Sequence, residues 1–130
     1  MSALRERSPV IFLEHRWLHG KKGDVPEGPY YLPIGKGKVV REGRDLTLVA
    51  TSFMIWEGLE AAKELSQQGI EMEIIDPMTL APLDRELIET SVRKTGNLLV
   101  ADTSWAPCGL SSEIVAMVAE KQWAFLKNPP

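Results

Sequence analysis

The sequence predicts an α/β/α sandwich built on a mostly parallel β-sheet. From residue 45 onward, short apolar runs alternate with amphipathic segments in the order strand, helix, strand, helix, strand, helix. Each apolar run is continuous, which is typical of strands that are buried on both faces of a parallel sheet. Parallel strands joined through helices make right-handed crossovers, so helices are expected on both faces of the sheet.

The first strand and helix of this pattern are the clearest. Leu46–Ala50 is a fully apolar strand candidate, and Thr51 or Ser52 is expected to cap the helix that follows. Gly69 predicts the end of that helix, because glycine readily adopts the left-handed conformation found there. The apolar positions of the helix recur with a 3.6-residue period, at Ile55, Leu59, Ala62 and Leu65.

Two further strand and helix pairs complete the pattern. Glu71–Ile75 and Asn97–Ala101 are the strand candidates. Asp84 is expected to cap a helix that ends at Gly96, and a last helix is expected from about residue 109 to residue 125. The side chains expected to face inward are Leu87, Ile88, Ser91 and Val92 in the first helix, and Ile114, Val115, Val118 and Phe125 or Trp123 in the second.

The N-terminal third of the chain has a different composition. Pro9–Leu13 is rich in β-branched and aromatic residues and predicts a strand, with proline tolerated at its first position. Residues 20–29 hold several glycines and prolines and predict a connecting loop. Lys38–Arg41 is bounded by Gly37 and Gly43 and predicts a short edge strand.

Composition excludes several classes of protein. The chain has 130 residues, a size typical of one domain. Its net charge of −3 argues against nucleic acid as a main partner, because phosphate binding needs a clustered basic surface. It has no apolar run of the ~20 residues needed for a membrane helix. The N-terminus has no signal-peptide core and the single cysteine excludes an internal disulfide, so we expect a cytoplasmic protein.

In a parallel sheet, a ligand binds beyond the carboxyl ends of the strands. The loops expected there are residues 51–52, 76–82 and 102–107, and none has the glycines of a nucleotide-binding turn. Asp76 and Asp102 are expected to end neighbouring strands and could form a carboxylate pair at the edge of the sheet, although a turn or capping role is favoured. Trp105 lies in an exposed-type loop and is the best interface candidate among the tryptophans.

Two other groups of reactive residues have weaker claims. His15 and His19, with Asp24 or Glu14, could bind a metal, but a polar exit from a strand into a linker is the favoured interpretation. Cys108 precedes the last helix, where a thiol can become reactive, but no basic residue lies near it in sequence. We therefore expect Cys108 to be a small buried hydrophobic residue.

Nearly the whole chain resembles the C-terminal part of the β subunit of 2-oxoacid dehydrogenase E1 components of the pyruvate, branched-chain and acetoin type. Each matching segment is weak alone, but their order and spacing extend over more than 100 residues. The segments are Pro9–Glu14, Val25–Tyr30, Pro33–Gly37, Val40–Ala50, Ile74–Asp84 with its terminal Pro-Leu-Asp, Ser91–Gly96 and Leu99–Asp102.

The resemblance implies a transketolase C-terminal domain at residues 37–130, whose mixed sheet has one antiparallel edge strand, expected at Lys38–Arg41. It implies that residues 1–14 are the tail of a preceding thiamine-pyrimidine-binding domain and that residues 15–36 are a linker. The last strand of the family would follow Pro130, so we expect it to be missing. The unfilled strand position and the apolar Pro9–Leu13 segment predict self-association.

The resemblance also implies a function. The parent enzyme would use thiamine diphosphate and Mg to decarboxylate a 2-oxoacid oxidatively, with acyl transfer to lipoyl-E2. The catalytic histidine and the glutamate that contacts the cofactor belong to the preceding domain of the family. We therefore expect no catalytic, cofactor-binding or metal-binding residue in this chain, no cofactor on it, and no activity of the chain alone.

The expected partners are an E1 α subunit or α domain, a second β subunit and the E2 acyltransferase, with no nucleic acid and no membrane. The residues expected at these interfaces are Asp76, Met78, Asp102 and Trp105. Two alternatives are a free-standing α/β module that binds a small ligand or regulates, using loops 76–82 and 102–108, and a deoxyxylulose-phosphate-synthase-like enzyme. The charged linker at residues 25–36 better suits the E1 β type than the latter enzyme.

Overall fold

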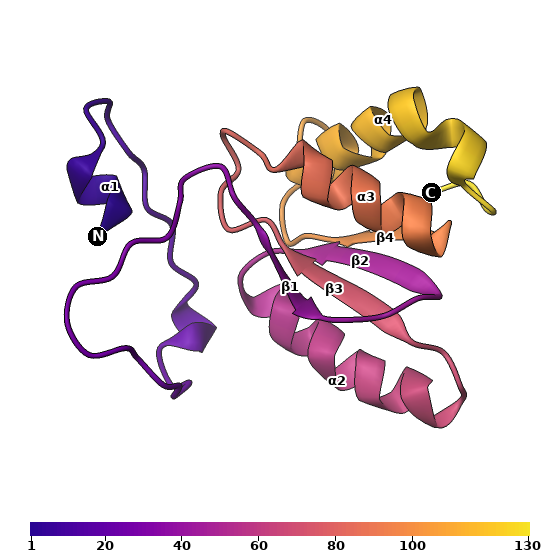
Figure 1. Ribbon diagram of the computed structural model, residues 1–130, viewed down its shortest axis with the longest axis horizontal. Coiled ribbons are helices and arrows are strands. Elements are labelled where there is room, and N and C mark those ends of the chain that lie inside the picture. Colours follow the sequence, from indigo (N-terminus) through magenta and orange to yellow (C-terminus); the bar gives the residue numbers. More distant parts are fainter.

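The computed structural model describes residues 1–130 and contains one four-stranded sheet with helices on both faces (Figure 1). The strands are β1 (Lys38–Arg41), β2 (Leu46–Ala50), β3 (Met72–Asp76) and β4 (Leu98–Ala101). The long helices are α2 (Phe53–Gln67), α3 (Arg85–Thr95) and α4 (Leu110–Gln122). The short ones are α1 (Ser2–Arg5) and the 3₁₀ helices η1 (Arg16–Leu18) and η2 (Trp123–Phe125).

The strands are arranged in the order β1-β3-β2-β4. β2 lies at the centre and pairs in parallel with both β3 and β4, as continuous apolar runs predict. β1 pairs antiparallel with β3, with Lys38 opposite Asp76. The expected mixed sheet with one antiparallel edge strand is therefore confirmed, and β4 forms the opposite edge.

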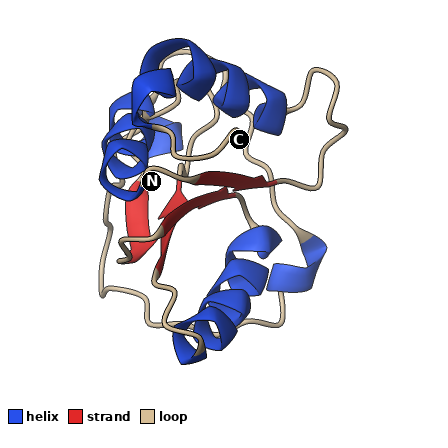
Figure 2. Cartoon of the chain, turned by 90° about the vertical axis from the view of Figure 1, so that its right-hand side faces the viewer, coloured by secondary structure: helices blue, strands red, loops and turns tan.

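Figure 2 shows helices on both faces of the sheet, and a cluster of buried apolar side chains lies on each side of it. Side chains alternate along each strand, so Leu48 and Ala50 of β2 face α2, whereas Val49 faces α3 and α4. The predicted three-layer sandwich is confirmed. The buried cluster on the α2 side is Leu48, Ala50, Ala62, Met72 and Ile74, and that on the other side is Val49, Ile75, Ile88, Val92, Leu98, Ile114, Met117 and Val118.

The ends of α3 follow the sequence closely. The Asp84 carboxylate accepts a hydrogen bond from the Leu87 amide at 3.3 Å, so the predicted N-cap is confirmed. Gly96 ends the helix with φ 74°, a conformation in which a Cβ would be strained. At the start of α2, Ser52 occupies the N-cap position, but its side chain makes no capping hydrogen bond.

Two predicted elements are wrong. Pro9–Leu13 forms no strand, because apolar β-branched residues make a strand only when another strand pairs with them, and residues 8–14 make no main-chain hydrogen bond here. Phe125 or Trp123 was expected on the apolar side of the last helix, but both are exposed. The α-helix ends at Gln122, and the tighter η2 turn changes the faces that the next side chains occupy.

Glu73 is a carboxylate in the middle of an apolar strand, and it is only 1% exposed. The Ser91 hydroxyl donates a hydrogen bond to one of its oxygens, and the Lys94 ammonium donates to the other. The Gly43 amide donates to that second oxygen at 3.4 Å. Glu73 thus connects β3 to two turns of α3 and to the turn between β1 and β2.

A hydroxyl cluster extends this connection to β2. The Thr47 Oγ1 lies 2.7 Å from both the Ser91 Oγ and the Thr95 Oγ1, and all three residues are buried. Gly43 approaches β3 so closely that a Cβ at this position would lie 2.2 Å from the Glu73 amide nitrogen. Every buried polar side chain atom has a partner, which is the condition for such a network to stabilise a fold.

The network fixes the charge of Glu73. Burial alone raises the pKa of a carboxyl, but hydrogen bonds from Lys94 and Ser91 lower the pKa of Glu73 below its ordinary value of 4.5. The same contact raises the pKa of Lys94. Both groups are therefore charged at neutral pH.

We predict that Glu73→Gln lowers the free energy of unfolding by about 1–3 kcal/mol at pH 7, since it leaves Lys94 without its buried partner. The pKa of Glu73 is lower in the folded than in the unfolded chain. Its contribution is therefore complete above pH 4.5 and is lost as the pH falls through the folded-state value. Urea unfolding from pH 7 to pH 3 should show the two proteins converging in acid.

The matched control is Glu60→Gln, which removes an exposed carboxylate paired with Lys63 on α2. Exposed pairs contribute little, so this variant should stay within about 0.5 kcal/mol of the parent at every pH. A Glu73→Gln protein as stable as the parent at pH 7 would contradict the structural role of the network.

Candidate functional site

The carboxyl ends of β2, β3 and β4 lie at one end of the sheet. We call this end the carboxyl edge, as distinct from the edge strands β1 and β4, and define it by loops 51–52, 76–84 and 102–109. Each of these loops contains one non-glycine residue with positive φ: Ser52 at 54°, Met78 at 56° and Cys108 at 62°. Such conformations persist only where the surrounding structure imposes them, and they occur often at functional sites. The carboxyl edge is therefore the candidate site.

Asp76 and Met78 form the start of the loop after β3. The Asp76 Oδ1 accepts a hydrogen bond from the Met78 amide at 2.8 Å, which makes a tight turn and leaves the Met78 side chain exposed. Burial raises the pKa of Asp76, and this effect exceeds the opposing effects of the Met78 amide and of the Lys38 charge.

The rest of this loop is bound to the segment that precedes β1. The Gly35 amide donates to the Thr79 Oγ1 at 3.0 Å, and the Gly37 amide donates to the Asp84 Oδ2 at 3.1 Å. The Lys36 ammonium lies 3.8 Å from the same Asp84 oxygen. Asp84 therefore caps α3 and also holds the chain where it enters the sheet.

Asp102 and Trp105 lie in the loop between β4 and α4. The Asp102 carboxylate accepts hydrogen bonds from the Ser104 hydroxyl and, at 3.1 Å, from the Ser104 amide. Partial burial raises the pKa of Asp102, but the Ser104 hydroxyl and the amides of Ser104, Ser111 and Thr103 lower it to a net value below the ordinary one. Trp105 is 81% exposed, which is unusual for so large an apolar side chain.

The structure does not bring the two aspartates together. β2 lies between β3 and β4, so Asp76 and Asp102 are separated by two strand spacings, about 10 Å. The carboxylate-pair hypothesis is wrong, because strands that are successive in sequence are not neighbours in this sheet. The four expected interface residues instead form two pairs, Asp76 with Met78 and Asp102 with Trp105, on separate loops of the carboxyl edge.

The histidines and the cysteine make no reactive cluster. His15 stacks on Phe53 with ring centroids 5.5 Å apart, and His19 lies 3.5 Å from the Glu14 carboxylate. No three His, Cys, Asp or Glu side chains are placed to hold a metal ion. Cys108 is exposed, so its predicted burial is wrong; the residue lies in the loop, before α4 begins.

An aromatic contact that was not predicted from the sequence holds residues 17–21 at the same edge. Trp17 of η1 meets Phe53, the first residue of α2, edge to face at 5.0 Å, and Lys21 lies 4.6 Å above the Trp56 ring. The sequence signal that could have predicted this contact is the pair of aromatic residues, Phe53 and Trp56, at the start of the helix that follows β2. In Figure 1 the N-terminal segment accordingly lies beside the strand ends, away from the C-terminus.

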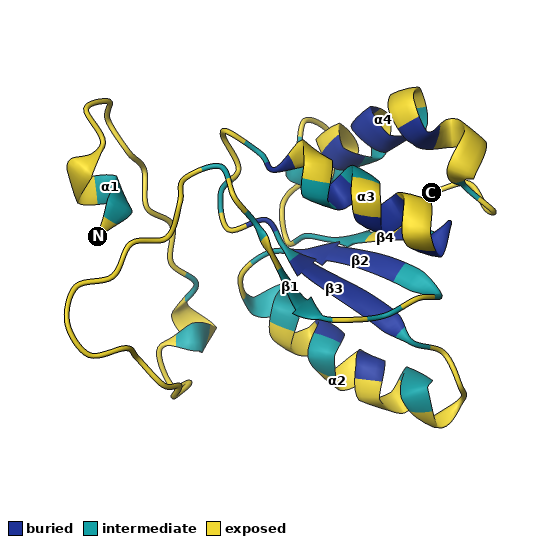
Figure 3. Ribbon diagram, viewed as in Figure 1, coloured by how far each residue is buried: buried dark blue, intermediate teal, exposed yellow.

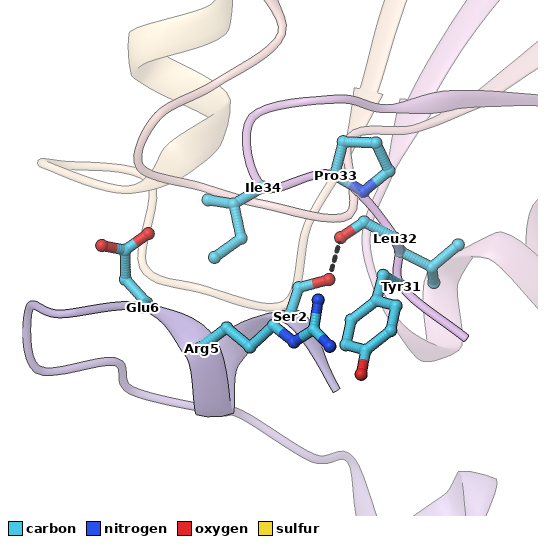
Figure 4. Close-up of a pocket in the computed structure, with 7 residues that line it drawn as sticks. All are labelled: Ser2, Arg5, Glu6, Tyr31, Leu32, Pro33 and Ile34. Carbon is cyan, nitrogen blue, oxygen red and sulfur yellow. Dashed lines mark hydrogen bonds between the residues drawn. The ribbon is translucent and has the colours of Figure 1, made fainter. Parts of the chain in front are cut away.

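A hollow of ≈ 440 Å³ lies between α1 and residues 31–34 (Figure 4). The Ser2 hydroxyl donates to the Leu32 carbonyl, and the Arg5 guanidinium lies 3.8 Å from the Tyr31 ring centroid. A second hollow of ≈ 360 Å³ lies near the amino end of β4, beside Asn128 and Pro129. Neither hollow is lined by any of the four expected interface residues.

Exposure separates the chain into two parts (Figure 3). Residues 1–36 are almost entirely exposed or half-buried, whereas all fully buried residues lie from Thr47 onward. No helix has both the length and the apolar character needed to cross a membrane.

Known proteins are similar to this chain over nearly its whole length. The chain is 42% identical to the acetoin:2,6-dichlorophenolindophenol oxidoreductase subunit beta of Cupriavidus necator over 98% of its length, and 40% identical to that of Bacillus subtilis over 99%. It is 39% identical to the pyruvate dehydrogenase E1 component subunit beta-1, mitochondrial, of Arabidopsis thaliana. It spans only 38%, 38% and 36% of the length of these relatives.

A solved structure described as a split gene transketolase, inactive beta4 tetramer, superposes with a TM-score of 0.67 at 37% identity. The superposition covers 71% of this chain and 30% of that chain. The family "Transketolase, C-terminal domain" matches residues 35–130, which include the whole sheet and its three long helices. The chain therefore belongs to the transketolase C-terminal domain family.

Proposed function

We propose that the chain is the C-terminal interface domain of a thiamine-diphosphate-dependent 2-oxoacid dehydrogenase E1 β subunit. The observation that carries this proposal is the identity of about 40% to acetoin and pyruvate dehydrogenase β subunits over nearly the whole chain. These relatives are more than twice as long as the chain. In this proposal residues 37–130 are the domain, residues 15–36 are the linker and residues 1–14 are the tail of a preceding domain.

The parent reaction would be oxidative decarboxylation of a 2-oxoacid with acyl transfer to lipoyl-E2. We propose that the residues of this chain hold no thiamine diphosphate by themselves. In support, no group of three His, Cys, Asp or Glu side chains is placed to hold a metal ion, and the hollows of ≈ 440 and ≈ 360 Å³ are lined by no residue of the carboxyl edge. The cofactor would therefore be held by other parts of the parent enzyme, and the chain alone would be inactive.

The contribution of this domain would be assembly. Trp105 presents a large apolar surface at the carboxyl edge, and exposed tryptophans surrounded by polar groups are the side chains that contribute most to interfaces. Met78, which is 37% exposed, adds an adaptable apolar contact on the loop after β3. We propose this edge as the surface for an E1 α subunit or domain, a second β subunit and E2.

A cytoplasmic location, expected from the sequence, also belongs to this proposal. The relatives include proteins from two bacteria as well as a plant protein with a mitochondrial name.

We predict that the chain competes with a related β subunit for its partner. Reconstitution of the Bacillus subtilis acetoin:2,6-dichlorophenolindophenol oxidoreductase from separate subunits should lose activity when this chain is added in excess. Trp105→Ala combined with Met78→Ala should weaken that inhibition at least about tenfold, because each lost apolar contact costs about 1 kcal/mol or more and about 1.4 kcal/mol is a factor of ten.

The matched control is Trp123→Ala, which removes a tryptophan of similar exposure at the other end of α4. It should inhibit as well as the unaltered chain. No inhibition at any ratio, or equal inhibition by the Trp105 and Met78 variant, would contradict the proposed interface.

We also predict that the isolated chain neither binds thiamine diphosphate with Mg in a calorimetric titration nor decarboxylates pyruvate or 2-oxoisovalerate. A saturable heat of binding or saturable decarboxylation would contradict the proposal that the cofactor site lies outside this chain. Saturable binding of a different small molecule at loops 76–82 and 102–108 would favour a free-standing binding module instead.

A further inference from the structure

We propose that residues 33–37, which we call the entry segment, form a joint with loop 76–84 that transmits the path of the preceding chain to Met78. The entry segment leads directly into β1, so a displacement of the residues before it reaches the sheet at this point. The joint is a property of the chain itself, whereas its use in regulating assembly rests on the function proposed above.

Thr79 makes the first contact of the joint. The Gly35 amide donates a hydrogen bond to the Thr79 Oγ1 at 3.0 Å, and the same hydroxyl donates to the Pro82 carbonyl at 2.9 Å. One hydroxyl thus links the entry segment to a turn within the loop. Because Thr79 is the next residue after Met78, a shift of Gly35 acts on the Met78 backbone through a single residue.

Asp84 makes the second contact, and it is only 7% exposed. Its Oδ2 accepts a hydrogen bond from the Gly37 amide at 3.1 Å and lies 3.8 Å from the Lys36 ammonium. Its Oδ1 accepts from the Leu87 amide at 3.3 Å in the first turn of α3. A carboxylate that binds donors from two segments holds those segments together, since a buried donor without an acceptor is unfavourable.

The entry segment also packs closely against the loop. A Cβ added to Gly35 would lie 2.9 Å from the Pro82 Cγ, and one added to Gly37 would lie 2.8 Å from the Asp76 carbonyl oxygen. No space therefore separates the two segments at these points. Movement of the entry segment toward the loop must push the loop, and movement away must break the hydrogen bonds described above.

Met78 is the residue on which a displacement of the loop has its effect. Its φ of 56° is a conformation that a methionine keeps only while its surroundings impose it. The Met78 amide is held by the Asp76 Oδ1 at 2.8 Å, and the following residue is held by Gly35. When Thr79 is released, Met78 is free to leave the positive-φ region, and this change of backbone alters the direction of its side chain.

The joint therefore has a bound state and a released state. In the proposed interface, Met78 would be presented to the partner in the bound state and displaced in the released state. A change in the position of the preceding part of the chain would thereby strengthen or weaken assembly without contact between that part and the partner.

NMR spectroscopy of the ¹⁵N-labelled full chain tests transmission from the entry segment. Gly35→Ala places a methyl group against Pro82, and it should displace the amide signal of Met78. The matched control is Gly28→Ala, because Gly28 has φ 78°, close to the 82° of Gly35, but a Cβ there meets nothing within 4 Å. This control adds the same backbone strain without touching the loop, so the Met78 signal should keep its position.

A second pair of variants tests the hydroxyl of Thr79. Thr79→Val removes it at nearly constant volume, and the Gly35 amide should then exchange with solvent at least about tenfold faster. The backbone order parameter of Met78 should fall from about 0.85 to below about 0.6. Thr79→Ser keeps the hydroxyl, so exchange at Gly35 should stay within about threefold of the parent.

An unchanged Met78 in both Gly35→Ala and Thr79→Val would overturn the proposal. An equal change of Met78 in Gly28→Ala would also overturn it, because the effect would then arise from strain in the preceding chain and not from the joint. If Gly35→Ala does not fold, the Thr79 variants decide the result. These measurements use the chain alone, so a failed inhibition assay would contradict the interface and leave the joint in place.

Discussion

The arrangement of the sheet depends on the ion pair between Glu73 and Lys94, because this interaction holds three separate parts of the chain together. Glu73 lies in β3, Lys94 lies in α3, and the Gly43 amide that shares the carboxylate lies in the turn that reverses β1 into β2. An unpaired carboxylate at this depth would cost several kcal/mol, so the strand register that places Glu73 under α3 is strongly preferred. A one-residue slip of β3 would turn Glu73 toward the apolar α2 side.

This constraint leaves the other end of the sheet free for function. The network lies toward the amino ends of the parallel strands, and the loops at the carboxyl edge carry the strained residues Ser52, Met78 and Cys108 instead. The two edge strands of the sheet also differ: β1 carries charged Lys38 and Arg41, whereas β4 is apolar. The carboxyl edge and the outer side of β4 are therefore separate surfaces of one domain.

Most of the fold could be predicted from the sequence because its signals are local. Three of these signals depend only on residues close to them in the sequence: the apolar run Leu46–Ala50, the N-cap Asp84 and the helix-ending Gly96. The failures concern contacts between distant residues. Pro9–Leu13 has the composition of a strand but no strand to pair with. The strand order that separates Asp76 from Asp102 cannot be predicted from the residues of the two loops. The only sign of the Glu73 network in the sequence is an acidic residue between Met72 and Ile74. The partners of Glu73 in α3 lie about 20 residues away, so the sequence does not identify them.

The most direct test of this account is a carboxyl carbon NMR titration of Glu73 in the folded chain. The account predicts a midpoint below the ordinary value of 4.5, because the hydrogen bonds from Lys94 and Ser91 outweigh the effect of burial. It also predicts that Lys94→Met moves the midpoint upward. A midpoint above 4.5 in the parent chain would show that Glu73 is buried without effective partners, and would contradict the view that its ion pair holds the fold together.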